Sequence, residues 1–373
     1  MKRHVLLCLA AIFFIPTFSL SQNLPAAELL FAAVVGPSPV TLNSTALAVG
    51  SRTLDAGQPN LIKTLRQYLG RELTYPGGLY TSSLDSATWQ NASWPNLTLR
   101  SMAMSAAAGQ AQLLLGADNG VLRPFNNPTG WQLVTDWQVA QIMDLRRDPF
   151  DDRVLYACSA NGIFISPDGG ATWRNSNQGL NNLFVSCLFP DPKVKGRLFA
   201  GTEGGLYQST DGGRNWQQLA LPNIPVRAIW REPESWPGIF WVGTERHGLY
   251  ESVDGGQTFL PVAIGEEGIS IYSLAGGGSN RPIYAGAYQR GIFFASSVGQ
   301  NWQQMPGSER LGSVTCILPL HDRNALFAGT YDRGVQFSRD DGKTWKVFGL
   351  VGAYVRQLVA GETSWLRPVD QSK

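Results

Sequence analysis

Glycine stands eleven residues ahead of an aromatic residue at seven places in this chain of 373 residues, and the aromatic residues follow one another at intervals of 42 or 43. The seven pairs are Gly78/Trp89, Gly120/Trp131, Gly162/Trp173, Gly205/Trp216, Gly248/Phe259, Gly291/Trp302 and Gly334/Trp345. A constant period of this length is typical of a chain that repeats one supersecondary unit. We therefore expect residues from about 30 to 360 to form one closed assembly rather than two or three domains.

The clearest copy of the unit spans residues 185–219. Short runs of β-branched, aromatic and aliphatic residues at 185–189, 197–201, 205–209 and 216–219 alternate with turn residues, which predicts four strands. Four strands in about 43 residues is the size of one propeller blade. We predict an all-β fold, in which residues 28–373 form a single seven-bladed propeller of four-stranded antiparallel blades.

The turn between the third and fourth strands of a unit has the pattern Ser-x-Asp-x-Gly-x-x-aromatic. Aspartate can hydrogen-bond the backbone two residues on, glycine accepts a positive φ, and the aromatic ring packs between neighbouring sheets. We therefore assign these aspartates and aromatic residues a structural role and expect no metal or cofactor at the turns, which are spread around a rim. The intact copies supply Asp168 with Trp173, Asp211 with Trp216, Asp254 with Phe259, and Asp340 with Trp345.

These turns resemble the Asp-box (BNR) repeats of propellers such as sialidases, xyloglucan-active glycosidases, sortilin and the photosystem II assembly factors. The resemblance covers about residues 30 to 360 and implies the propeller fold. Because all of these families use the box as a turn, the resemblance does not assign an activity.

The N-terminus has the pattern of a secretory signal. Lys2, Arg3 and His4 precede an apolar stretch at 5–18, and small residues follow at 19–21. We predict a signal peptide at 1–21, with an uncleaved anchor as the alternative, and hence an exported protein of the periplasm or the extracellular space. A net charge of +2 without basic runs gives no indication of binding to nucleic acid or to an anionic membrane surface. Membrane contact is therefore expected only through an uncleaved anchor. We also expect the protein to be a monomer.

The first unit and the chain ends depart from the repeat. Residues 355–361 match the first-strand pattern and would close the ring, while residues 29–35 are a competing candidate for the same strand. Residues 46–51 resemble a second strand, and Gly78 follows Gly50 after an insertion. Helical spacing of apolar residues predicts a short amphipathic helix within an insertion at about 52–75, which either packs on the ring or acts as a lid or docking element.

Cysteine usage is sparse. Cys158, Cys187 and Cys316 remain after signal removal and do not form a disulfide framework. Cys187 and Cys316 occupy equivalent places in two units, and we expect both to be small core residues.

Candidate binding residues lie just ahead of the repeat glycines, because the turn between the second and third strands must face away from the Asp-box turns. Arginine and tyrosine are frequent anchors for anionic ligands, sugars and protein partners. The alternative is that these side chains are ordinary exposed turn residues. The predicted binding patch consists of Glu203, Glu245, Arg246, His247, Tyr288, Arg290, Tyr331, Asp332 and Arg333.

The function that we predict is non-catalytic binding or assistance in assembly, with a protein or glycan as partner. The alternative is an Asp-box glycoside hydrolase, sialidase-like or xyloglucanase-like. We assign no catalytic residue, because Ser/His/Asp and P-loop patterns are missing and nothing sets Glu203 and Glu245 apart as acid and base. Two carboxylates about 5 to 10 Å apart in a cleft would favour the glycosidase. His247 and His321 give almost no support for zinc, and no cofactor is expected.

Overall fold

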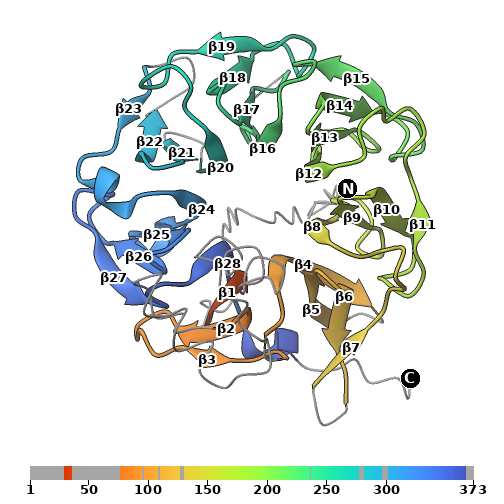
Figure 1. Ribbon diagram of the computed structural model, residues 1–373, viewed down its shortest axis with the longest axis horizontal. Helices are drawn as coiled ribbons and strands as arrows, with labels where there is room; N and C mark the ends of the chain where they lie inside the picture. Colours follow the sequence, from red (N-terminus) through yellow and green to blue (C-terminus); the bar gives the residue numbers. More distant parts are fainter. Residues whose placement is uncertain are drawn as a thin grey trace, which may run out of the picture.

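The computed structural model describes residues 29–35, 76–94, 96–107, 110–126, 130–235, 237–276, 281–295 and 301–366. Within these ranges the chain forms seven four-stranded antiparallel sheets, arranged as blades around a central axis (Figure 1). The predicted seven-bladed, all-β propeller is confirmed. The predicted signal peptide at 1–21 and the predicted helical insertion at 52–75 lie outside the described residues.

Each blade takes consecutive strands from the axis outwards, except the first, whose order is β28-β1-β2-β3. The bounds are β1 (Leu29–Val35), β2 (Gly78–Ser83), β3 (Gln90–Asn91), β4 (Leu99–Ala107), β5 (Gln110–Ala117), β6 (Gly120–Pro124), β7 (Trp131–Leu133), β8 (Ile142–Arg147), β9 (Leu155–Ser159), β10 (Gly162–Ser166), β11 (Arg174–Asn175), β12 (Val185–Pro190), β13 (Leu198–Thr202), β14 (Gly205–Ser209), β15 (Gln217–Ala220), β16 (Val226–Arg231), β17 (Phe240–Thr244), β18 (Leu249–Ser252), β19 (Leu260–Val262), β20 (Ile271–Gly276), β21 (Ile283–Ala287), β22 (Gly291–Ala295), β23 (Gln303–Gln304), β24 (Val314–Leu320), β25 (Ala325–Thr330), β26 (Val335–Ser338), β27 (Lys346–Gly349) and β28 (Tyr354–Gly361). Short 3-10 helices lie at Ser308–Leu311, His321–Arg323 and Thr363–Leu366.

The ring is closed by both ends of the described chain. The C-terminal strand β28 is the innermost strand of the first blade, and β1 pairs with it antiparallel over residues 29–35 while pairing with β2 on its other side. Residues 29–35 therefore hold the second-strand position, so the sequence-based assignment of that strand to residues 46–51 is wrong. The apolar sequence of β1 suits the second-strand position, because five of its seven residues are buried between two strands and the neighbouring blades.

A side-chain clamp reinforces this closure. The Gln357 side chain on β28 accepts a hydrogen bond from the backbone N–H of Met102 at 2.6 Å and donates one to its carbonyl at 3.2 Å. Met102 belongs to β4 of the second blade, so the amide acts like one more strand residue across the blade boundary. The contact joins residues 255 positions apart in the chain.

The repeat glycine opens the third strand in five blades and immediately precedes it in the other two. All seven repeat glycines have positive φ, between 67° and 147°. At Gly291 a Cβ atom would lie 2.1 Å from the Ser308 carbonyl oxygen, and at Gly334 it would lie 2.2 Å from that of Leu350. Backbone conformation and close approach of the following segment thus both require glycine at these two positions.

The Ser-x-Asp turns are closed by hydrogen bonds within each turn. In the fourth blade the Ser209 hydroxyl donates to Asp211 at 2.8 Å and accepts from the Gly213 N–H at 2.9 Å. Asp211 also accepts from the Asn215 N–H at 3.0 Å. The same serine-to-aspartate bond is present at Asp168, Asp254 and Asp340. These carboxylates shape their own turns.

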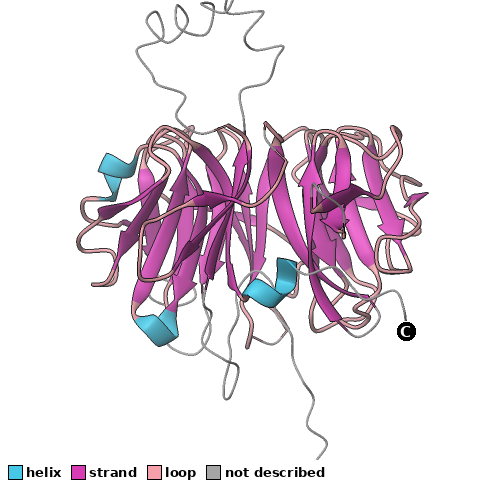
Figure 2. Cartoon of the chain, turned by 90° about the horizontal axis from the view of Figure 1, so that it is seen from below, coloured by secondary structure: helices cyan, strands magenta, loops and turns pink. Residues whose placement is uncertain are grey.

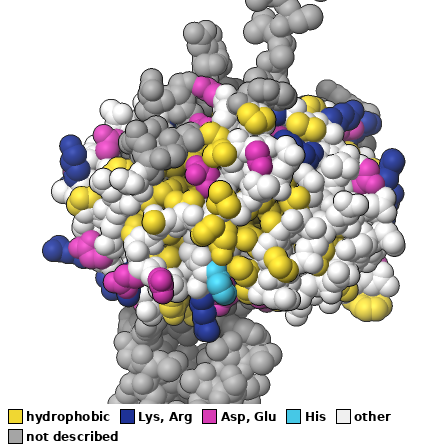
Figure 3. Space-filling view, turned by 90° about the horizontal axis from the view of Figure 1, so that it is seen from above, with side chains coloured by type: hydrophobic (Ala, Val, Ile, Leu, Met, Phe, Trp, Pro, Cys, Tyr) yellow, Lys and Arg dark blue, Asp and Glu magenta, His cyan; other side chains and the backbone are white. Residues whose placement is uncertain are grey.

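Burial is greatest at the second strands and lowest at the rim. Second strands such as β9, β13, β17 and β21 are buried throughout, whereas the outermost strands β3, β11 and β23 are two residues long and exposed. Such short edges offer little backbone for strand pairing with other molecules. In side view the strands run between two faces, and turns lie along both of them (Figure 2). On the side that carries β19, acidic and basic side chains are interspersed (Figure 3).

Candidate binding site at the channel mouth

The face opposite the Ser-x-Asp turns, here called the distal face, is where the innermost strands begin. The side chain that follows the first buried aliphatic residue of each innermost strand lines a pocket of about 110 Å³ in the central channel. The pocket receives residues from all seven blades. The ring of side chains at its mouth consists of Arg100, Met143, Ser186, Arg227, Tyr272, Thr315 and Arg356.

Arg227 joins two of the predicted site residues. Its Nη1 lies 2.8 Å from Glu203 Oε1 of the neighbouring blade, and its Nε lies 3.0 Å from Glu245 Oε2 of its own blade. Burial acts to lower the pKa of Arg227, but the hydrogen bonds and charges of the two carboxylates outweigh it and raise the pKa above its ordinary value. The guanidinium is therefore a fixed positive charge with both carboxylates as acceptors.

Two further arginines of the channel also have carboxylate partners. Arg100 lies 2.7 Å from Asp118, and Arg146, deeper in the channel, lies 2.9 Å from Asp144. Arg356 is different, because among the described residues no hydrogen bond or ion pair satisfies its guanidinium, although the side chain is only partly exposed. The channel mouth therefore presents one cation without an acceptor beside cations that are already neutralised.

Tyrosines border this mouth in two contacting pairs. Tyr288 meets Tyr272 edge to face with ring centroids 6.0 Å apart, and Tyr331 lies against Tyr354 at 4.9 Å. Tyr288 is 45% exposed and Tyr331 is 51% exposed, so both keep ring surface in solvent. Burial, followed by the negative charge of Glu245, raises the pKa of Tyr272, which therefore remains a neutral hydroxyl at ordinary pH. Tyr354 is the first residue of β28 and lies two residues before Arg356.

The other predicted patch residues lie on the distal face in separate turns. Arg290 pairs with Glu266 at 3.1 Å, and the guanidinium of Arg333 donates to the Arg310 carbonyl. Arg246 has φ of 62°, and its N–H donates to Ser270 Oγ. His247 Nδ1 lies 2.8 Å from the Glu245 carbonyl, and Asp332 is partly exposed. Among the described residues the three arginines share no acceptor.

The sequence analysis missed Arg100, Arg227, Tyr272 and Arg356. They could have been found from the sequence, because each directly follows the first aliphatic residue of an innermost strand, as in Val226-Arg227 and Val355-Arg356. The repeat register places such positions around the channel. The turns ahead of the repeat glycines contain Glu203 and Glu245, the acidic partners of Arg227, but they do not contain the arginines of the channel.

The cysteines of the channel wall are chemically quiet. Cys187 is buried and Cys316 is partly exposed, and their equivalent positions put each sulfur against the glycine of the adjacent second strand, Gly201 or Gly329. Burial raises the pKa of Cys187 to about 11 and that of Cys316 to about 12, so both remain thiols at ordinary pH. Among the described residues there is also no group of three or more His, Cys, Asp or Glu side chains that would hold a metal ion.

The Glu203 and Glu245 carboxylates converge without forming an acid and base pair. Both contact the guanidinium of Arg227, Glu203 at Nη1 and Glu245 at Nε. Glycoside hydrolysis, however, requires one protonated carboxyl and a free space for the sugar between the two groups. Here the guanidinium of Arg227 lies between the two carboxylates and contacts both. The arrangement is suited to fixing the position of the Arg227 guanidinium and of the two carboxylates.

The comparisons with known proteins agree on the fold. No family model matches the chain, and no curated protein matches it. Among solved structures, the extracellular domain of the one-component system BT4673 from B. thetaiotaomicron is similar with a TM-score of 0.56 and 18% identity, over 70% of this chain and 35% of that one. The GH74 xyloglucanase from Xanthomonas campestris has a TM-score of 0.53 and 19% identity, over 66% and 45%. YCF48 bound to D1 peptide has a TM-score of 0.52 and 12% identity, over 68% and 82%.

These similarities extend over part of each protein. The chain spans about a third of the BT4673 domain and under half of the xyloglucanase. None of the helical segments in the described ranges has the length and apolar character needed to span a bilayer. At such low identity the shared property is the architecture: the chain is a seven-bladed propeller with structural neighbours that include the BT4673 extracellular domain, GH74 enzymes and YCF48.

Proposed function

We propose that this protein is an exported, non-catalytic propeller that binds an acidic segment of a protein partner at the channel mouth of its distal face. The observation that carries the proposal is Arg356, whose guanidinium has no acceptor among the described residues although it lines the central channel. A partly buried cation without an acceptor is costly, and a carboxylate from a ligand would relieve that cost.

The surroundings of Arg356 favour a protein ligand. Exposed Tyr288 and Tyr331 stand on two neighbouring blades of the same face, and tyrosine supplies contact area together with a hydrogen-bonding hydroxyl. The neutralised Arg227 and Arg100 keep the mouth from being uniformly positive, which limits binding of polyanions such as nucleic acid. YCF48, which has a similar fold, has been solved with a peptide, so the architecture is compatible with peptide capture.

The export assignment rests on the N-terminal pattern at residues 1–21. A partner would then be found in the periplasm or the extracellular space. Fractionation of cells that express the full chain tests this part, and recovery of the protein in the cytoplasm with residues 1–21 intact would contradict it.

The binding test compares arginines on the two faces. Immobilised protein is offered an array of short peptides that end in Asp or Glu, and the peptides retained by the wild type are measured by calorimetry. We expect Arg356→Ala to weaken binding by about tenfold or more and Arg356→Lys to retain part of it. Arg214→Ala is the matched control, because Arg214 is an exposed arginine in a Ser-x-Asp turn on the other face. Equal binding by the two alanine variants would refute the proposal.

A glycoside hydrolase is the second candidate, favoured by the proximity of Glu203 and Glu245. The guanidinium of Arg227 between them is the reason that we rank it lower. The wild type, Glu203→Gln and Glu245→Gln are incubated with neutral and sialylated oligosaccharides, and released reducing sugar is measured. Turnover by the wild type that both variants lose would establish the enzyme and overturn the non-catalytic proposal.

A further inference from the structure

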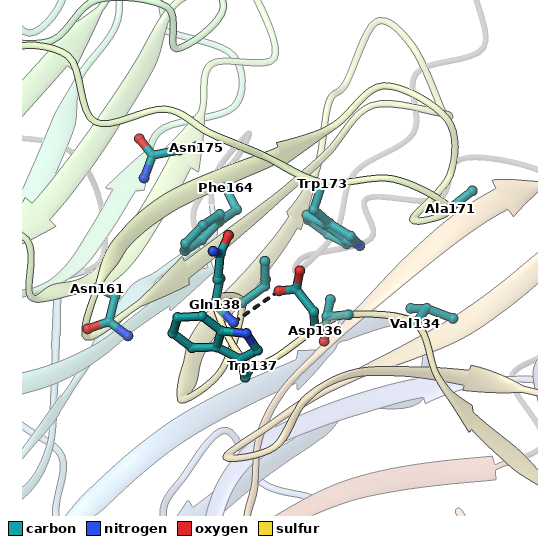
Figure 4. A pocket seen from close by; sticks show the side chains of 11 residues that line it. Val134, Asp136, Trp137, Gln138, Asn161, Phe164, Ala171, Trp173 and Asn175 are labelled. Atoms are coloured by element: carbon teal, nitrogen blue, oxygen red, sulfur yellow. Dashed lines mark hydrogen bonds between the residues drawn. The ribbon is translucent and has the colours of Figure 1, made fainter.

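A second pocket lies away from the channel, between the second and third blades. Its volume is about 650 Å³, within the range of pockets that hold small organic ligands. One wall is the segment 134–139 that follows β7, and the other is formed by the turn before β10, the strand β10 itself and the region around β11 (Figure 4). It contains none of the residues of the channel mouth.

Trp137 is the outstanding residue of this pocket. It is 82% exposed, the largest exposed fraction among the large hydrophobic side chains of the described residues. A fixed turn presents it: the Gln138 N–H donates to Asp136 Oδ1 at 3.0 Å, and the Val139 N–H donates to the Asp136 carbonyl at 3.1 Å. Thr135 Oγ1 accepts from the Val121 N–H of β6 at 3.0 Å. Because these hydrogen bonds fix the backbone on both sides of Trp137, its exposed ring is pre-organised to contact a ligand.

Aromatic rings of the third blade face the same hollow. Trp173 is half-buried, and its indole N–H is already used in a 3.1 Å bond to the Gly170 carbonyl, so the ring contributes surface rather than a donor. Phe164 lies at the floor and is buried. Figure 4 shows Trp137 from one blade with Trp173 and Phe164 from the other around one space. The pocket therefore has flat apolar walls on two sides.

The polar side chains of the pocket are mainly amides. Among the described residues the side chains of Gln138 and Asn161 have no hydrogen-bond partner, and Asn175 uses only its Oδ1, which accepts from the Asn177 N–H at 3.1 Å. An amide offers both donors and an acceptor, which suits hydroxyl groups because a hydroxyl also does both. Asp136 is the one charged side chain in the lining, and no Lys or Arg is present there.

We propose that this pocket binds a neutral saccharide. Trp137 stacks on the apolar face of a pyranose ring, and Asn161, Asn175 and Gln138 hydrogen-bond its hydroxyls. The lining disfavours the other ligand classes: a phosphate or nucleotide would need a cation, and an acyl chain would leave three amides without partners. The site is independent of the acidic-peptide site, since the two share no residue.

The test uses defined sugars: cellotetraose, maltotetraose, xylotetraose, mannotetraose and, as the anionic probe, tetragalacturonic acid. Binding to the full mature chain is measured by calorimetry and by protection of tryptophan fluorescence from iodide quenching. At least one neutral tetrasaccharide should bind, and Trp137→Ala should weaken that binding by about tenfold or more, as for a central aromatic anchor. Trp137→Phe should be intermediate, which separates lost stacking from misfolding. Asn161→Ala should weaken it severalfold.

Two controls make the outcome decisive. Leu260→Ala removes another exposed hydrophobic side chain, from the fifth blade, and Arg356→Ala alters the channel mouth, and both should bind the sugar like the wild type. The proposal is overturned if no neutral tetrasaccharide binds, if Trp137→Ala binds as the wild type does, or if the galacturonide binds most tightly. Loss of sugar binding in Arg356→Ala would also overturn it, because the site would then be the channel.

Discussion

The indole N–H of Trp89 donates a hydrogen bond of 3.0 Å to the carbonyl of Phe348, which lies 259 residues further along the chain. Trp89 belongs to the first blade and Phe348 to the seventh, so this bond crosses the seam where the ring closes. The same bond joins Trp131 to Ala92 and Trp216 to Ser176, each time to the preceding blade. The seam is therefore built like an ordinary blade boundary.

Trp89→Phe should lower stability by about 1 to 3 kcal/mol, because the Phe348 carbonyl loses its donor while most of the ring packing is kept. Urea unfolding followed by circular dichroism measures the change, and the midpoint should fall with little change in the slope. Trp137→Phe, at an exposed tryptophan, is the control and should leave the midpoint where it is. An unchanged midpoint in Trp89→Phe would show that the seam bond contributes nothing.

Gly291→Ala and Gly130→Ala separate two costs of replacing a glycine. Both glycines have φ near 70°, but a Cβ at Gly130 meets nothing within 4 Å, whereas one at Gly291 lies 2.1 Å from a backbone carbonyl oxygen. We expect Gly130→Ala to cost about 1 to 2 kcal/mol for the left-handed conformation alone. Gly291→Ala should cost about 1 to 3 kcal/mol more because of the overlap. Equal thermal shifts in the two variants would contradict the role of close approach.

The Ser-x-Asp turns should make the protein sensitive to acid. Hydrogen bonds from Thr344 and Ser338 lower the pKa of Asp340 to about 2, below the value of about 3.9 expected in the unfolded chain. A depressed pKa gives stability that is present above the unfolded value and is lost as pH falls through the folded one. Asp340→Asn should thus be less stable than the wild type at pH 7, and the difference should shrink between about pH 5 and pH 2.

The measurement for this prediction is the denaturation midpoint at a series of pH values. Asp322→Asn, at an exposed residue of a 3-10 helix, removes the same charge outside a Ser-x-Asp turn and serves as the control. If the two variants lose stability in parallel at every pH, the hydrogen bonds of the turn are not the cause.

Arg227→Met should destabilise the distal face, because Glu203 and Glu245 would remain as partly buried like charges without their shared cation. The expected cost is about 1 to 3 kcal/mol, measured by urea unfolding. Adding Glu203→Gln and Glu245→Gln to Arg227→Met should recover part of it, since the repulsion is then removed. A triple variant no more stable than Arg227→Met would mean that the arginine acts by packing alone.

The repeat allowed much of the fold to be predicted. The spacing of Gly291 and its equivalents from the aromatic residues gave the number of blades and the start of each third strand, because positive φ and close approach leave glycine as the suitable residue there. The first blade was harder. Residues 46–51 look like a second strand locally, but that position went to residues 29–35, which pair with β28 from the opposite end of the chain.

The candidate site was only partly predictable. Glu203 and Glu245 were identified from their turns, yet their shared partner Arg227 lies on an innermost strand and contacts them only because neighbouring blades converge on the channel. Arg290 and Arg333 were grouped by sequence position, whereas their guanidiniums bind Glu266 and the Arg310 carbonyl. Side-chain partners across blades depend on strand order and ring closure, which local patterns do not encode.

Local sequence patterns were enough to predict the repeat unit, the number of its copies and the residues that form each turn, because glycine at positive φ and aspartate at a tight turn act over a few residues. Only the tertiary structure decided which ends meet, that Trp89 bonds to Phe348, and that Arg356 lies in the channel without an acceptor among the described residues. These are contacts between distant segments, and their free energy exists only after the ring has closed.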